Sequence, residues 1–199
     1  WRHTLSICSS TNIKVYGLTL AESGGDGIYL GTSTQWVTNK DIHIKDVVCE
    51  SHYRQGISVI TAENLLIENT VMRNTRGTPP QAGIDFEPNH PEERLVNVVM
   101  RNCLTENNNG AGYVLYLRPL RAHSEPLSVR FENCRALNDH NVSAGVYNNN
   151  AAGAAVTGSV VFANCVLQGS GRAGISIGDN PPSGLAIRFE DVTLINPAA

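Results

Sequence analysis

Two carboxylates stand two residues apart in the segment "QAGIDFEPN", where Asp85 and Glu87 alternate with the apolar residues Ile84 and Phe86. This alternation is typical of a β-strand and places both acids on one face, with their Cβ atoms about 7 Å apart. Hydrolysis of a glycosidic bond needs one protonated and one ionised carboxyl group. The pair could therefore catalyse glycoside hydrolysis. The alternative is a pair of solvated surface acids bound to nearby arginines.

A third acid, Asp26, lies in "SGGDGIYLG", directly before a glycine that opens another strand pattern. If this strand lies two layers from that of Asp85, the two acids are about 9 to 10 Å apart. An inverting hydrolase separates its carboxyl groups by roughly 6.5–9.5 Å to leave room for water. Asp26 is therefore a further catalytic candidate, and an ordinary turn residue before glycine is its alternative.

Aromatic and basic side chains near these acids could contact a sugar, because aromatic faces and guanidinium groups suit neutral or acidic glycans. The candidates for substrate binding are Tyr29, His52, Arg54, Arg76, His90, Tyr116 and Arg118.

Two other functions stay open. A polysaccharide lyase would need a base and a charge neutraliser, for which an arginine could serve while Asp85 and Glu87 hold calcium. Two carboxylates alone make a poor calcium site, and the histidines show no ligand-spaced pair, so we expect no metal for the hydrolase. A non-catalytic binding or structural module is the third possibility, and its outer face should lack such a cluster of acids.

The strands that carry these residues recur along the chain. A glycine followed by an apolar residue opens a strand at positions 27, 56, 83, 112, 145 and 174. A second series of alternating strands interleaves with the first and ends at a polar or glycine turn residue: Gly17, Asp46, Asn69, Asn102, Asn133, Asn164 and Asp191. Two short strands in about 30 residues cannot bury their faces alone, so successive repeats must stack.

The repeated pattern resembles the pectate-lyase-like right-handed parallel β-helix superfamily, from about residue 5 to residue 196. The resemblance implies an all-β, single-stranded β-helix of six to seven coils, with a polysaccharide groove on the outer face of one sheet. A more distant likeness is to polygalacturonase-type glycosidases, whose acids precede the strand glycine on two successive coils and are followed by a histidine. Asp26 fits one such place, but Gln55 stands where the histidine would be, so that mechanism is not carried over.

Stacking aligns equivalent residues in columns about 4.8 Å apart. Cys103, Cys134 and Cys165 should form one column that fills the core, and the turn asparagines should form a hydrogen-bonded ladder. The residue after each glycine should point inward, namely Ile28, Ile57, Ile84, Tyr113, Val146 and Ile175. The next should point to solvent, namely Tyr29, Ser58, Asp85, Val114, Tyr147 and Ser176.

Composition excludes several classes of protein. A net charge of −3 argues against nucleic acid as a partner, and no apolar run approaches the roughly 18 residues of a membrane span. Five cysteines without a CxxC pair argue against a zinc ribbon. Residues 1–10 and the final "INPAA" show no cap, so we expect one domain over 1–199, a segment of a longer chain whose ends further coils or a partner cover. The expected location is secreted, cell-surface or periplasmic.

Overall fold

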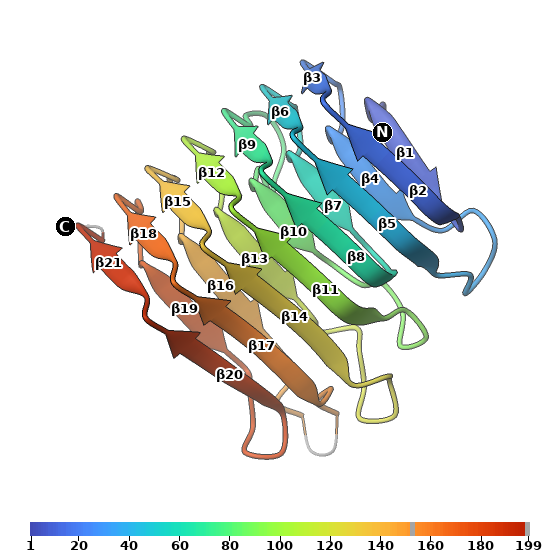
Figure 1. The fold of residues 1–199 in the computed structure, drawn as a ribbon. Helices are drawn as coiled ribbons and strands as arrows, with labels where there is room; N and C mark the ends of the chain where they lie inside the picture. Colours follow the sequence, from blue (N-terminus) through green and yellow to red (C-terminus); the bar gives the residue numbers. More distant parts are fainter. Residues whose placement is uncertain (152–153, 198–199) are drawn as a thin grey trace.

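The computed structural model describes residues 1–151 and 154–197, and these form one right-handed parallel β-helix (Figure 1). Three seven-stranded sheets run the length of the stack, and all of their strand pairs are parallel. The two termini lie at opposite ends of the stack. The predicted all-β solenoid is confirmed. Within the described residues, no helix is long and apolar enough to cross a membrane.

Each coil contributes one strand to each sheet. Sheet 1 contains β1 (Leu5–Cys8), β4 (Ile28–Gly31), β7 (Ile57–Val59), β10 (Ile84–Phe86), β13 (Tyr113–Tyr116), β16 (Ala144–Tyr147) and β19 (Ile175–Gly178). Sheet 2 contains β2 (Thr11–Tyr16), β5 (Asn39–Lys45), β8 (Ala62–Glu68), β11 (Leu95–Arg101), β14 (Leu127–Glu132), β17 (Gly158–Ala163) and β20 (Leu185–Glu190). Sheet 3 contains β3 (Thr19–Ala21), β6 (Val48–Glu50), β9 (Val71–Arg73), β12 (Leu104–Glu106), β15 (Arg135–Leu137), β18 (Val166–Gln168) and β21 (Thr193–Ile195).

Sheet 3 was not expected, because the sequence pattern indicated two strands in each repeat. Every strand of sheet 3 is only three residues long, and each except β21 buries a single residue, such as Cys49 or Met72. Three residues are too few to show an alternating pattern. The expected count of two strands per coil was therefore wrong, although the stacking period was right.

The predicted turn ladder lies between sheets 2 and 3. Its described Asn and Asp members have backbone φ angles of 50° to 54°, a left-handed conformation that these residue types tolerate. The side-chain amide of Asn69 donates to Asp46 at 3.1 Å, and that of Asn102 donates to Asn69 at 3.3 Å. Each amide thus holds the coil next to it in register.

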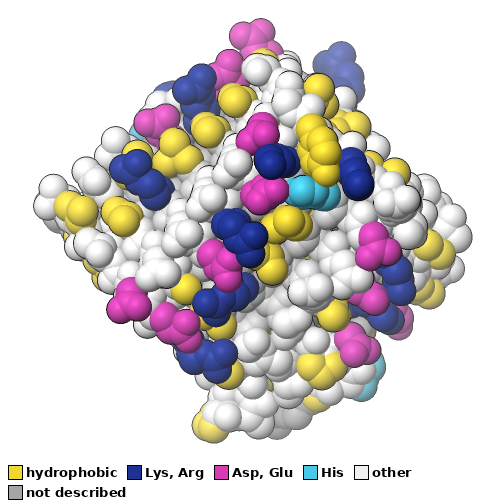
Figure 2. Space-filling view, viewed as in Figure 1, with side chains coloured by type: hydrophobic (Ala, Val, Ile, Leu, Met, Phe, Trp, Pro, Cys, Tyr) yellow, Lys and Arg dark blue, Asp and Glu magenta, His cyan; other side chains and the backbone are white. Residues whose placement is uncertain are grey.

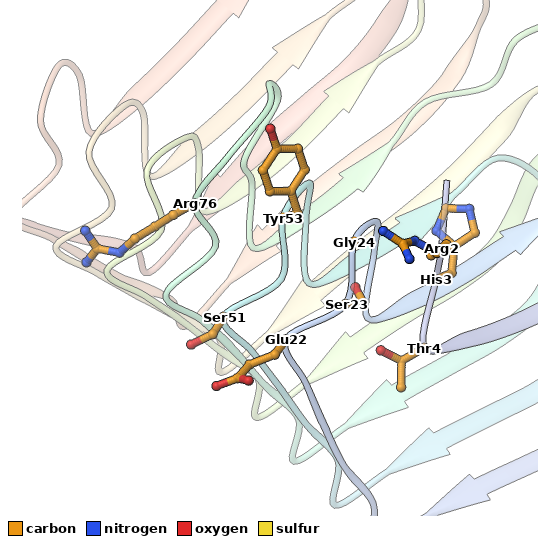
Figure 3. Close-up of a pocket in the computed structure, with 9 residues that line it drawn as sticks. All are labelled: Arg2, His3, Thr4, Glu22, Ser23, Gly24, Ser51, Tyr53 and Arg76. Carbon is orange, nitrogen blue, oxygen red and sulfur yellow. The ribbon is translucent and has the colours of Figure 1, made fainter.

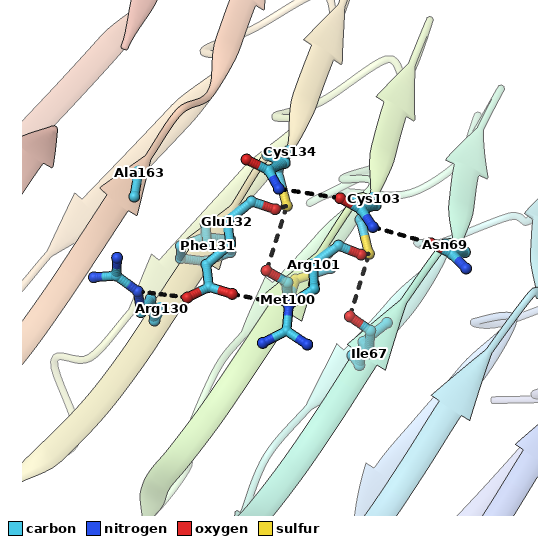
Figure 4. A network of polar contacts seen from close by, with 12 residues as sticks. Ile67, Asn69, Met100, Arg101, Cys103, Arg130, Phe131, Glu132, Cys134 and Ala163 are labelled. Carbon is cyan, nitrogen blue, oxygen red and sulfur yellow. Dashed lines mark hydrogen bonds and ion pairs between the residues drawn. The ribbon is translucent and has the colours of Figure 1, made fainter. Parts of the chain in front are cut away.

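The interior is built from columns of matching side chains. Cys103, Cys134 and Cys165 align as predicted, and none of them forms a disulfide. Their thiols donate to backbone carbonyls instead, as Figure 4 shows for Cys103 with Ile67 and for Cys134 with Met100. An adjoining column stacks Phe131 on Phe162, with ring centroids 4.2 Å apart.

The outer face of sheet 2 carries acids and bases side by side (Figure 2). Glu132 accepts from Arg101 at 2.9 Å and from Arg130 at 2.8 Å, and Glu68 contacts His43 at 2.9 Å. Exposed ion pairs of this kind contribute little stability individually. Most of these ion pairs join adjacent coils, which is the arrangement expected of a solvated surface.

Sheet 1 corrects one part of the expected register. Tyr113 pairs with Ala144, whereas Val146 was expected in that place. The backbone N–H of Tyr113 donates to Ser143, which occupies the position held by glycine before the other inner strands from β4 onward. Gly145 therefore lies inside β16 and does not open it. The sequence pattern predicts Gly145 before a strand because an internal glycine followed by an apolar residue shows the same pattern.

The last coil leaves apolar side chains partly open, with Leu194 48% and Ile195 37% exposed. Ala198 and Ala199, the final residues of "INPAA", lie outside the described residues.

Candidate active site

The outer face of sheet 1 holds a hollow of about 310 Å³, here called the acid hollow. Ile84 and Phe86 point into the core, so the residues alternating with them, Asp85 and then Glu87, point outward. The loop between β9 and β10 forms one wall. The lining residues are Arg54, Pro79, Pro80, Asp85, Glu87, Val114 and Tyr116.

Asp85 faces outward but is only 2% exposed, so the alternative of a solvated surface acid is wrong for Asp85. Its Oδ1 atom is buried and has no hydrogen-bond partner in the protein. Burial, and then the charge of Glu87, raise the pKa of Asp85 well above the ordinary aspartate range. The Asp85 carboxyl group therefore stays protonated at pH values where ordinary surface acids are ionised.

Gln55 is a buried neighbour of Asp85 that the sequence interpretation did not count among the site residues. Only one orientation of its amide satisfies the surrounding groups. In that orientation its nitrogen donates to Asp85 Oδ2 at 3.2 Å, and its oxygen accepts from Ser58 at 2.9 Å and from Arg54 at 2.8 Å. A signal was present, because the next residues in the same column are apolar: Ala82, Ala111 and Val142.

Arg54 joins two of the three predicted catalytic acids. Its Nη2 atom donates to Glu87 at 3.0 Å, and its Nη1 atom lies 3.5 Å from Asp26 Oδ2. The ring of Trp1 covers the guanidinium, with 5.9 Å between Cζ and the ring centroid. Glu87 is 31% exposed at the hollow, so it combines an ion pair with access to solvent.

Asp26 is fully buried and does not line the acid hollow. Burial raises its pKa to about 6, although the nearby charge of Arg54 opposes the shift. His3 Nδ1 accepts the backbone N–H of Asp26 at 3.1 Å and also lies 3.2 Å from Oδ2. Burial lowers the pKa of His3, so the ring is neutral and this second contact is not an ion pair. Asp26 thus acts on the hollow through Arg54.

Two aromatic surfaces lie along sheet 1 on either side of the acids. Tyr29 stacks on His3 with centroids 4.5 Å apart, two coils from Asp85. Tyr116 lies one coil beyond Glu87 and is tilted against Tyr147, with centroids 6.3 Å apart.

Arg118 lies over the ring of Tyr116 at 5.3 Å and forms an ion pair of 2.7 Å with Asp179. The predicted residues Tyr29, Arg54, Tyr116 and Arg118 therefore follow one surface with Asp85 and Glu87.

Three predicted sugar contacts lie elsewhere. Arg76 borders a separate hollow of about 620 Å³, where it comes from the side opposite Arg2 and His3 (Figure 3). His52 has no exposed surface, bonds Ser23 through Nδ1 at 2.9 Å, and has its pKa lowered to about 4 by burial. His90 packs edge-on against Trp36 in the loops that follow sheet 1.

The lyase alternative assigns calcium to Asp85 and Glu87, which are two acids only. No group of three or more His, Cys, Asp and Glu side chains among residues 1–151 and 154–197 could hold a metal ion. The guanidinium of Arg54 lies between Asp26 and Glu87, where a cation would otherwise bind.

The chain belongs to the right-handed β-helix family, whose sequence profile for a right-handed beta helix region matches residues 3–193. No match was found among curated protein sequences. The pectate lyase Pel9A has a similar structure, with a TM-score of 0.58 and 10% identity over 91% of this chain and 51% of that protein.

The tailspike protein gp49 of Acinetobacter baumannii bacteriophage Fri1, a capsular polysaccharide depolymerase, gives a TM-score of 0.54 and 16% identity over 100% of this chain and 41% of its own. This chain thus spans about half the length of each solved structure, or less. At these identities the likeness shows the fold.

Proposed function

We propose that this protein is a glycoside hydrolase that cleaves a polysaccharide in the acid hollow. The observation that carries the proposal is the contrast between two neighbouring carboxyl groups. Asp85 is buried with an unpartnered oxygen, while Glu87 is partly exposed and bound to Arg54. Two titratable groups in such different surroundings can divide the roles of acid and base.

Asp85 is the proposed general acid, and Gln55 decides which of its oxygens carries the proton. The Gln55 amide donates to Oδ2, so Oδ2 serves as an acceptor and the proton resides on Oδ1. Oδ1 has no hydrogen-bond partner in the protein but is covered, so we propose that glycan binding exposes it and lets it donate to the glycosidic oxygen. Protonation of the leaving group lowers the barrier to cleavage of the bond between this oxygen and the anomeric carbon.

Glu87 is the proposed second carboxylate, which accepts a proton from the attacking water. Arg54 orients this carboxylate through the 3.0 Å contact and is itself held by Asp26. In each turnover the proton of Asp85 goes to the leaving sugar, the water hydroxyl goes to the anomeric carbon, and the proton of that water goes to Glu87. Proton transfer from Glu87 to Asp85 through solvent restores the starting state.

The two similar structures support a polysaccharide as the substrate, because one is a pectate lyase and the other a capsular polysaccharide depolymerase. A polymeric glycan is also compatible with the open, elongated outer face of sheet 1. We therefore propose that the protein works outside the cell or at its surface, with the polysaccharide as its partner.

No observation favours the lyase alternative over hydrolysis. The arginine base of that alternative would be Arg54, Arg76 or Arg118, and arginine does not lose its proton in proteins. Two carboxylates also flank the guanidinium of Arg54. The proposal requires no metal, since the acid, the base and the positioning groups are all protein side chains.

The test is to incubate the purified protein with a panel of neutral and acidic polysaccharides and to measure newly formed reducing ends. We expect release from at least one polymer, without the ultraviolet absorbance of unsaturated uronates that a lyase would produce. Asp85→Asn and Glu87→Gln should each lower the rate by about 10²–10⁴-fold.

Arg76→Gln is the matched control, because this residue borders the other hollow. Its rate should remain within about 2-fold of the wild type, a change of under about 0.5 kcal/mol in barrier height. Release that survives Asp85→Asn would remove Asp85 from the reaction, and unsaturated products would replace hydrolysis by elimination.

A further inference from the structure

We infer that the sugar units bound in the acid hollow are uncharged, so the substrate is a neutral glycan and not a polyuronate. This inference rests on the proposed function and adds the substrate class. Two observations support it: the arginines around the hollow are already paired with protein groups, and carboxyl groups outnumber the arginines there.

Arg54 is the only cationic side chain that lines the hollow within the described residues, and its guanidinium is already occupied. It contacts Glu87 and Gln55 at 3.0 and 2.8 Å, and Asp26 at 3.5 Å. Trp1 covers the group, and only 16% of the side chain is exposed. A substrate carboxylate would have to displace one of these protein groups to form the forked pair that arginine makes with carboxylates.

Arg118 is the next guanidinium along sheet 1, at the rim beside Tyr116. Asp179 holds it in an ion pair of 2.7 Å, and the amide of Asn150 donates to the same carboxylate at 3.2 Å. The charge of Arg118 is therefore offset before any ligand arrives.

The remaining charge in the hollow is acidic. It is the charge of Glu87, which lines the hollow beside the protonated Asp85, while Asp26 lies behind Arg54. A uronate unit would bring its carboxylate beside Glu87, and like charges placed together at an interface weaken binding.

The other lining residues are Pro79, Pro80, Val114 and Tyr116, which present apolar and aromatic surface. The C–H faces of a neutral sugar pack well on such surface, while its hydroxyl groups can bond to the carboxyl groups.

Backbone-matched polymers provide the first test. Several polyuronates are compared with the same polymers after chemical reduction of their carboxyl groups to alcohols, together with a panel of natural neutral glycans. The Kd for each is measured with the Asp85→Asn variant, and cleavage is measured with the wild type. We expect a neutral polymer to bind at least about 10-fold more tightly than any polyuronate, a difference of about 1.4 kcal/mol.

The two proposals fail in different ways. Cleavage of a polyuronate, or binding of one as tight as that of its reduced form, would overturn this inference and leave hydrolysis standing. Selective binding of neutral polymers without any cleavage would overturn the hydrolase and leave this inference standing. Failure to bind any neutral glycan would count against the inference.

A second test releases the charge of Arg118. Asp179→Asn removes its partner, and we expect the affinity for polyuronates to rise by about 5-fold and to fall again with added salt. Asp191→Asn is the control, because it changes the net charge equally at a turn between sheets 2 and 3. If the two variants bind polyuronates with equal affinity, the pairing of Arg118 with Asp179 does not disfavour acidic glycans, and this part of the inference is wrong.

Discussion

Two buried carboxyl groups of the β-helix, those of Asp139 and Asp85, differ in how many hydrogen bonds they accept. Asp139 accepts from Thr105 at 2.8 Å, and from the backbone and the side chain of Asn108 at 3.1 and 2.8 Å. Asp85 accepts only from Gln55 and has one oxygen with no partner. Burial raises the pKa of both groups, to about 6 for Asp139 and well above its ordinary range for Asp85.

The difference teaches that burial alone does not mark a functional acid in this fold. The bonds of Asp139 tie one turn to the next, which is a structural use of a carboxyl group. Asp85 lines a hollow and has one oxygen without a hydrogen-bond partner in the protein. Such an oxygen costs stability in a core but is useful in a catalytic site. Changes at Asp139 should therefore affect stability, and changes at Asp85 should affect activity.

The largest expected effect is on catalysis. Asp85→Asn should lower kcat by about 10²–10⁴-fold through loss of the general acid. Its midpoint of thermal unfolding should stay near that of the wild type, because the replaced group has few bonds to lose. Reducing-end release and circular dichroism on the same samples measure the two quantities.

Asp139→Asn is the counterpart and should show the reverse. It should lose about 1–3 kcal/mol of unfolding free energy, because the amide sets a donor against the donors that surround it. Its kcat per folded molecule should match that of the wild type. A large drop in kcat for Asp139→Asn, with stability unchanged, would show that Asp139 also serves activity and would contradict the comparison.

Phe162→Ala should be the most destabilising single change in the interior, at about 3–5 kcal/mol. The ring is fully buried and stacks between Phe131 and Phe189, with centroids 4.2 and 5.1 Å away. Denaturant unfolding gives the value, and the residual activity of the folded fraction should be unchanged. A loss below about 1 kcal/mol would mean that the aromatic column is not a main source of stability.

The contribution of Asp26 to stability should fall as pH rises from about 4 through 6, while that of His52, whose pKa is lowered to about 4, should rise. The pKa of Asp26 is raised to about 6 from its ordinary 3.8, so between these values the folded chain binds protons that the unfolded chain has released. Protonation therefore favours folding at acid pH, by at most about 3 kcal/mol for this one group. The difference in unfolding midpoint between the wild type and Asp26→Asn should show this fall across the range. An unchanged slope in the variant would assign the effect to other buried acids such as Asp139.

The smallest expected effect concerns the turn ladder. Asn102→Ala should cost about 1–2 kcal/mol, because alanine loses the amide bonds to the neighbouring coils and is disfavoured at the φ of 53°. Asn102→Gly keeps the backbone conformation and should cost less. Equal losses in the two variants would mean that the amide ladder, and not the backbone conformation, provides the stability.

Much of this architecture could be predicted, because residues of the same type recur at the period of the coil. Asp46, Asn69 and Asn102 recur at the coil period, and the structure aligns them in one hydrogen-bonded ladder. Sheet 3 was missed because its strands are too short to show a pattern. The register at β16 was misjudged because Ser143 replaces the glycine that opens the preceding strands.

The candidate site could be predicted only in part. Alternation along β10 showed that Asp85 and Glu87 share the outer face, and their clustering with Arg54 on adjacent coils followed from the period. Two partners that complete the site come from other coils: Gln55, marked only by the apolar residues that follow it in its column, and Trp1, which stands in no recognisable motif.

The coil, its period and the direction of side chains along the predicted strands could be read from the sequence, because these depend on local alternation and on residues that tolerate left-handed turns. Only the tertiary structure decided that Asp85 is buried and that one arginine is shared by Asp26 and Glu87. The reason is physical. Desolvation and ion pairing depend on what neighbouring coils and loops place over a side chain, and irregular loops such as residues 74–83 follow no period from which that placement could be read.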